Sequence, residues 1–153
     1  MKSKSEIAFC KLFDIFIKME NYQTQLLFVY GTLLLADNKY GEFLLQHAEM
    51  VCIAKFPGEL FDLGTYPGAI YNSKKKEFVE GRIFKMDNID EVLATLDYYE
   101  GIGEIDCEYE RRIIEVDTDE GLRLCYCYIF NQPTNGKRKI LGGNYLNYLN
   151  RKC

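Results

Sequence analysis

The chain has 153 residues, a length that suits one domain burying roughly two-thirds of its surface. Its 19 basic and 23 acidic residues give a net charge of -4, which provides no general attraction to nucleic acid or anionic membranes. No apolar run approaches the roughly twenty residues of a membrane-spanning helix, and Lys11 and Asp14 interrupt the apolar residues near the N-terminus. We therefore expect a cytoplasmic protein that binds neither nucleic acid nor membrane.

The cysteines and the single histidine give no sign of a metal centre or a thiol enzyme. The six cysteines are expected to be reduced in the cytoplasm. Cys125 and Cys127 share a face of a strand-like run, and because no second pair stands at zinc-ligand spacing we interpret them as packing residues. A thiol enzyme would need His47 to meet one particular cysteine, which no spacing supports. We expect no metal ion and no organic cofactor.

The first elements along the chain are an extension and a buried strand. Residues 1–25 carry a weak helical stripe, and we interpret them as an N-terminal extension that either docks loosely or stays mobile. Met19 is an alternative start of the chain, ahead of a domain spanning residues 26–153. The run Leu26–Tyr30 is β-branched and aromatic, as is typical of a buried strand, and Gly31-Thr32-Leu33 follows it directly.

This glycine-containing turn is a candidate binding loop. A glycine after a buried strand lets backbone amides approach a ligand closely, and successive exposed N–H groups can bind an anion. The candidate residues are Tyr30, Gly31, Thr32 and Leu33. The same residue pattern also occurs in ordinary turns from strand to loop, so the loop alone does not define a function. Beyond it, Asn38 precedes a helical stripe that includes His47.

From Val51 onward the sequence predicts mostly strands. The predicted runs are 51–56, 58–63, 69–72, 78–86, 109–116 and 122–130. Proline and glycine separate the first three, and Lys74 to Lys76 form the tip of a hairpin before the fourth. Strands that dominate and are joined by hairpins predict an α+β fold built on a curled, largely antiparallel sheet or a small barrel.

A helix is predicted directly after Asn88. Its apolar residues recur at three- and four-residue steps and form one stripe, made by Ile89, Val92, Leu93, Leu96 and Tyr99. Asn88 is a suitable N-cap, and Glu91 is placed to complete a capping box. Gly101 and Gly103 are expected to end the helix because glycine adopts the left-handed conformation at little cost.

Glu100, in the last turn of this helix, is the candidate catalytic residue. It follows Ile89 by eleven residues, close to a whole number of turns, so its carboxylate is expected to point along the apolar stripe. Apolar surroundings and the negative end of the helix dipole both disfavour the charged form and raise the pKa. A general base near neutral pH needs such a pKa. The alternative is a glutamate that turns out to solvent.

Six segments, in this order and spacing, resemble the gamma-glutamylcyclotransferase family, particularly its short branch acting on gamma-glutamylamines. They are VYGTL (29–33), GELFDLGTYPGAI (58–70), VEGRIF (79–84), LDYYEG (96–101), YERR (109–112) and ILGGNYLNYL (140–149). The resemblance covers about residues 26–149. It implies a small mixed, largely antiparallel β-barrel with flanking helices.

The resemblance also implies a reaction and its residues. The α-amine of a small gamma-glutamyl compound attacks its own side-chain amide, which releases 5-oxoproline and an amine or amino acid without a cofactor. Glu100 would act as base and then as acid, and Tyr30 to Leu33 would form the substrate-binding loop. Tyr109 would line the pocket. Arg111, on the same strand face, would position Glu100 or a carboxylate unless it is an ordinary surface cation.

Two features leave alternatives open. The family usually has aspartate and tryptophan where this chain has Asn144 and Tyr145, a difference that bears on specificity at the substrate's leaving end. The leaving group, an amino acid, lysine side chain or polyamine, is expected to touch variable loops such as 71–76 and 132–137. A non-catalytic binding module of the same fold and an unrelated thiol-dependent enzyme are the competing hypotheses.

Overall fold

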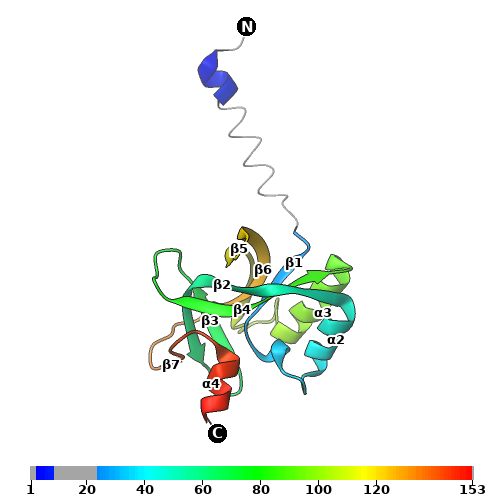
Figure 1. Cartoon of the computed structure of the whole chain (residues 1–153), viewed down its shortest axis with the longest axis vertical. Coiled ribbons are helices and arrows are strands. Elements are labelled where there is room, and N and C mark those ends of the chain that lie inside the picture. The colour runs from blue at the N-terminus through cyan, green and yellow to red at the C-terminus, as the bar shows by residue number, and fades with distance from the viewer. Residues whose placement is uncertain (1–2, 9–23, 153) are drawn as a thin grey trace.

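The computed structural model describes residues 3–8 and 24–152 (Figure 1). The elements from Leu26 onward are β1 (Leu26–Val29), η1 (Thr32–Leu34), α2 (Lys39–His47), β2 (Ala48–Asp62), β3 (Pro67–Tyr71), β4 (Phe78–Met86), α3 (Ile89–Glu100), β5 (Tyr109–Thr118), β6 (Gly121–Phe130), β7 (Arg138–Lys139) and α4 (Tyr145–Lys152). The interpretation of residues 9–23 as part of an extension, with Met19 as an alternative start, lies outside the described residues.

Five of the strands close into a mixed barrel. The neighbours run β2-β4-β1-β6-β5, and β5 returns to β2 where Asp117 pairs with Lys55. β1 and β6 are parallel at Leu27 and Tyr126, whereas the other pairs are antiparallel. Helices α2 and α3 lie side by side against one side of the barrel (Figure 1). The predicted α+β fold with a small, largely antiparallel barrel is therefore confirmed.

β2 is one strand of fifteen residues, and the prediction of two strands separated at Pro57 was wrong. Its first part pairs with β4, and its last part, from Gly58, pairs with β3. Pro57 stands where the strand changes partner, so its missing N–H does not break a continuous ladder. The backbone N–H of Gly58 donates instead to the carbonyl of Glu77 at 2.9 Å.

The apolar residues form two cores, one on each side of the barrel wall. The interior core includes Phe28, Phe56 and the two buried cysteines, Cys125 and Cys127, which confirms the interpretation of the cysteines as packing residues. The outer core includes Leu27 and lies between the wall and the two helices. Alternate residues of β1 thus face opposite cores, which fixes the position of the strand's end.

The C-terminal residues that depart from the family pattern serve the barrel. Tyr145, at the start of α4, is buried in the interior core. Asn144 donates a hydrogen bond from Nδ2 to Oε2 of Glu80 at 3.1 Å, and its Oδ1 accepts one from the backbone of Asn147.

Across the described ranges, no helix combines the length and the apolar character needed to cross a membrane.

Candidate active site

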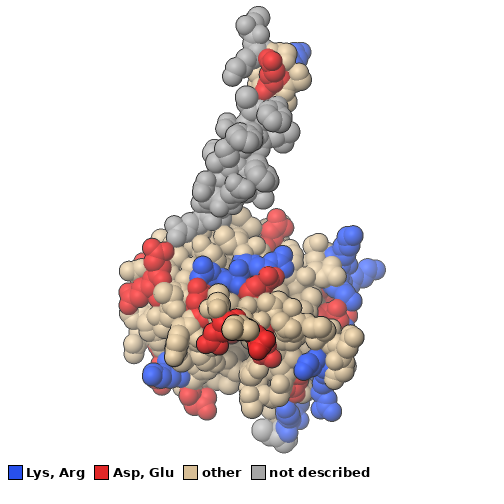
Figure 2. All heavy atoms as spheres, turned by 180° about the vertical axis from the view of Figure 1, so that it is seen from behind, with Lys and Arg blue, Asp and Glu red and all other residues tan. Residues whose placement is uncertain are grey.

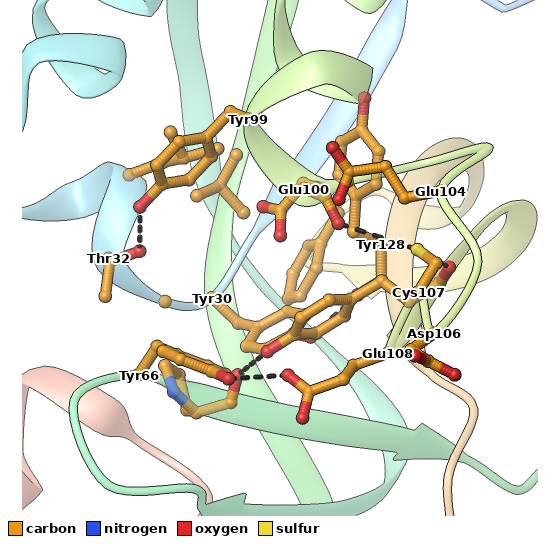
Figure 3. A pocket seen from close by; sticks show the side chains of 17 residues that line it. Tyr30, Thr32, Tyr66, Tyr99, Glu100, Glu104, Asp106, Cys107, Glu108 and Tyr128 are labelled. Atoms are coloured by element: carbon orange, nitrogen blue, oxygen red, sulfur yellow. Dashed lines mark hydrogen bonds between the residues drawn. The ribbon is translucent and has the colours of Figure 1, made fainter.

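A cavity of about 450 Å³ opens where the end of β1, the end of α3 and the start of β5 meet. Its walls come from residues far apart in the sequence. They are Phe28 to Leu33, Tyr66 and Pro67, Tyr99 to Gly101, Glu104, Asp106 to Tyr109, and Tyr128. Figure 3 shows Glu100 within this group, with Tyr99 and Thr32 to one side and Glu104 and Cys107 to the other.

The sequence ends α3 so that Glu100 reaches the cavity. Asn88 caps the first turn by accepting a hydrogen bond from the backbone of Glu91, as predicted. The reciprocal half of the capping box is absent because the N–H of Asn88 donates to Asp87 instead. At the other end, Gly101 has φ 73°, the left-handed conformation predicted for it. The chain turns there, and the last helical side chain, Glu100, lies at the cavity.

The carboxylate of Glu100 has the pKa of a neutral-pH base. Burial raises the pKa of Glu100 from its ordinary value to about 7, since a charged carboxylate is poorly solvated there. Leu96, Val92 and Leu93, on the same helix, are buried in the outer core. The group therefore exists in both protonation states near pH 7 and is able to accept and return a proton.

The glycine-containing loop faces the same cavity. Leu34 and Leu35 donate their N–H groups to Gly31 and Thr32, both at 3.0 Å. Within the described residues, the preceding amides of Gly31, Thr32 and Leu33 donate no hydrogen bond. A side chain at the position of Gly31 would be crowded, because a Cβ there would lie 2.9 Å from Cγ of Pro67, another residue of the cavity wall. The loop thus presents backbone donors at close range.

Tyrosine side chains line the cavity and are already hydrogen-bonded to the protein. Tyr109 donates to the carbonyl oxygen of Pro67 at 2.6 Å, and Tyr30 donates to that of Tyr128 at 2.7 Å. Burial, followed by the nearby charge of Glu100, raises the pKa of Tyr109. Burial also raises the pKa of Tyr30. Both phenols are therefore neutral at physiological pH, and their rings fix the shape of the cavity.

Arg111 lies outside the cavity wall. Its guanidinium forms an ion pair with Asp97 and stacks on the ring of Tyr126 at 5.5 Å. The other carboxylate oxygen of Asp97 accepts a hydrogen bond from the hydroxyl of Tyr128 at 2.7 Å. Tyr128 lines the cavity. Arg111 is therefore linked to the site only through Asp97 and Tyr128, and it contacts neither Glu100 nor the cavity itself.

The loop between α3 and β5 supplies cavity residues that the sequence did not single out. Glu104, Asp106 and Glu108 place three carboxylates on the wall. The loops 71–76 and 132–137, expected to meet the leaving group, do not line the cavity, and their contact with a leaving group stays a prediction. The sequence did contain a local signal for these residues, since acidic residues stand at every second position after α3, at Glu104, Asp106 and Glu108. Acidic side chains also gather near the middle of the face in Figure 2, next to a band of basic ones.

Neither a thiol-histidine pair nor a metal cluster is present in the described part of the chain. His47 pairs with Asp87 at 3.6 Å at the end of α2, away from the cavity wall, whereas Cys107 lines the cavity. The thiol of Cys107 donates to the carbonyl oxygen of Tyr109 at 3.0 Å. Residues 3–8 and 24–152 contain no group of three acidic, cysteine or histidine side chains that suits a metal ion.

Comparison with known proteins identifies the family. The model of the family described as gamma-glutamyl cyclotransferase, AIG2-like, matches residues 27–147. This range covers most of the chain, including the glycine loop and Glu100. The chain belongs to the AIG2-like gamma-glutamyl cyclotransferase family. None of the curated proteins matches the sequence.

Solved structures agree with this assignment of the fold. YkqA from Bacillus subtilis has a TM-score of 0.64 at 24% identity; the match covers 86% of this chain but 44% of YkqA, so this chain spans less than half of that protein. An AIG2-like protein from Mus musculus has a TM-score of 0.63 at 21% identity, covering 81% and 89% of the two chains. YtfP from Escherichia coli has a TM-score of 0.58 at 28% identity, covering 80% and 97%.

Proposed function

We propose that the protein is a gamma-glutamyl cyclotransferase with Glu100 as its proton-transfer residue. The α-amine of a gamma-glutamyl compound attacks the carbonyl carbon of its own side-chain amide. A five-membered ring closes as the bond to the leaving nitrogen breaks. One proton moves from the attacking amine to Glu100 and from there to the leaving amine. The products are 5-oxoproline and a free amine, and no atom enters from outside.

The observation that carries this proposal is a partly buried carboxylate, with a pKa of about 7, in a cavity that also contains unused backbone donors. The amides of Gly31 to Leu33 suit the oxygen that becomes negative in the tetrahedral intermediate, or the substrate's α-carboxylate. One such donor is typically worth about a hundredfold in rate. Because nucleophile and electrophile belong to one molecule, holding the substrate in a folded conformation in the cavity contributes the rest of the rate enhancement.

The first prediction is that wild-type protein releases 5-oxoproline and that Glu100→Gln does so far more slowly. Glutamine keeps the size of the side chain but cannot accept the proton, so turnover should fall roughly a hundredfold or more. Turnover is measured by incubating each protein with a panel of gamma-glutamyl amines and amino acids and quantifying 5-oxoproline by mass spectrometry. Glu91→Gln, an exposed glutamate on the same helix, is the control and should keep full turnover.

The outcomes separate the competing hypotheses. Full turnover by Glu100→Gln would contradict the assignment of the base. Binding of a panel member without 5-oxoproline would favour the non-catalytic binding module. Inactivation by iodoacetamide, combined with full activity of Glu100→Gln, would favour a thiol-dependent enzyme acting through Cys107.

We further propose that the leaving half of the substrate is an amine with a second positive charge. Glu104, Asp106 and Glu108 lie on the cavity wall, whereas no lysine, arginine or histidine among the described residues does. A leaving amino acid would bring its carboxylate toward these acids without a cation to receive it. A diamine or polyamine would bring an ammonium group instead.

The second prediction compares two leaving groups of equal size. The gamma-glutamyl derivative of 1,4-diaminobutane should have a kcat/KM about three- to tenfold above that of the pentylamine derivative, since each partly exposed ion pair contributes up to about 1 kcal/mol. High salt should narrow the difference because it screens these charges. Asp106→Asn should narrow it as well. Equal kcat/KM values for the two compounds would contradict the charge preference.

A further inference from the structure

Tyr99, the residue before Glu100, connects the end of α3 to the glycine loop. Its hydroxyl is 2.8 Å from Oγ1 of Thr32 and 2.9 Å from Nδ2 of Asn38 (Figure 3 shows the first contact). The other amide atom of Asn38, Oδ1, accepts from the backbone at the start of α2, so Nδ2 must be the donor toward Tyr99. The phenolic proton is then available to donate to Thr32.

The ring of Tyr99 is held as well as its hydroxyl. Tyr40 packs against it with ring centroids 4.6 Å apart at an interplanar angle of 32°. Tyr99 and Thr32 both line the cavity. One side chain therefore joins three elements, α3, η1 and the N-terminus of α2, at the place where the candidate base and the backbone donors face the same space.

We propose that Tyr99 and Thr32 act together as positioning residues for the cyclotransferase reaction. Their hydrogen bond sets the separation between the carboxylate of Glu100 and the amides of Gly31 to Leu33. This inference rests on the proposed function, because it concerns the geometry of that reaction. Proton transfer and oxyanion binding must occur on one small substrate, and a displacement of about 1 Å between such groups costs up to roughly a hundredfold in rate.

The experiment removes the hydrogen bond from either side. Tyr99→Phe keeps the ring and its packing on Tyr40 but lacks the hydroxyl, and Thr32→Val keeps the shape of threonine. Each should lower kcat about tenfold or more and change KM less than about threefold, since ground-state contacts remain while transition-state alignment is lost. The double variant should lose no more kcat than Tyr99→Phe alone, because Tyr99→Phe already deletes the hydrogen bond that Thr32→Val removes.

Tyr98→Phe is the matched control. Tyr98 is the neighbouring tyrosine on α3; it is 76% exposed and does not line the cavity. Its hydroxyl should therefore be removable without a change in kcat. Kinetics are measured from 5-oxoproline release, and thermal unfolding is recorded for each variant.

Three results would overturn the inference. A Tyr99→Phe variant with wild-type kcat and a lowered Tm would show that the hydrogen bond serves stability only. Multiplying losses of kcat in the double variant would show that Tyr99 and Thr32 act independently. Wild-type protein that releases no 5-oxoproline would overturn the proposed function and the positioning role with it, whereas the first two results leave the proposed function intact.

Discussion

At the scale of single residues, the site depends on where the side chain of Glu100 at the end of α3 points. Glu100 lies at the cavity and loses solvation, and this burial is the cause of its raised pKa. Tyr98, two residues earlier, is 76% exposed and contributes nothing to the apolar surroundings of Glu100. Helical periodicity was sufficient to predict the direction of Glu100, because that depends on the helix alone.

The third prediction concerns stability rather than turnover. The pKa of Glu100 in the folded protein, about 7, is above the ordinary value of 4.5, so the folded state binds the proton more tightly than the unfolded state. The contribution of this group to the free energy of unfolding is present at low pH and is lost as pH rises through about 7. Glu100→Gln lacks this loss and should be more stable than wild type above pH 7, by roughly 3 kcal/mol at most.

Urea denaturation at pH 4.5 and pH 8 measures this difference. The two proteins should be close in stability at pH 4.5 and clearly separated at pH 8. Glu91→Gln, at an exposed position, should follow the wild-type dependence on pH. Parallel stability curves for Glu100→Gln and wild type would contradict the burial of a titrating carboxylate.

At the scale of elements, local signals predicted α3 well and the long strand β2 poorly. Asn88 and Gly101 mark the ends of α3 because capping and the left-handed turn depend on adjacent residues. Pro57 suggested a break in β2, yet pairing with two different partners carries the strand through it. The acidic loop after Gly101 was missed as part of the site because loop direction depends on distant contacts, such as Tyr66 donating to Glu108 at 2.5 Å.

The fourth prediction concerns the packing of α2 on η1. Gly41, in the first turn of α2, lies so close to the glycine loop that a Cβ would be 2.6 Å from the carbonyl oxygen of Leu33. Gly41→Ala should therefore destabilise the protein by about 1–3 kcal/mol, although alanine is the better helix former by roughly 1 kcal/mol.

Chemical denaturation measures the effect of Gly41→Ala. Gln46→Ala is the control, since Gln46 is exposed on the same helix and its replacement should change stability by less than about 0.5 kcal/mol. Because the added methyl group presses on the loop beside Thr32, turnover should fall as well. An alanine variant more stable than wild type would show that helix propensity outweighs the contact.

At the scale of the whole molecule, most strands and the helices α2 and α3 followed from the sequence, but the closure of the sheet did not. The α+β class was predictable because hairpins and alternating patterns are local. The parallel pairing of β1 with β6 and the contact of β5 with β2 join distant segments, which no local pattern specifies. The resemblance between motifs implied the barrel, and the pairing of β5 with β2 confirmed it.

The position of β1 between β4 and β6 has a consequence during synthesis on the ribosome. β1 is translated early, yet one of its edges stays unpaired until residues 121–130 have left the exit tunnel. Until then its apolar residues are open to chaperones and to aggregation. Tyr30 also has to wait for the carbonyl of Tyr128 before its hydroxyl is bonded. The cavity is thus completed late, and a nascent chain that stops before β6 has no assembled site.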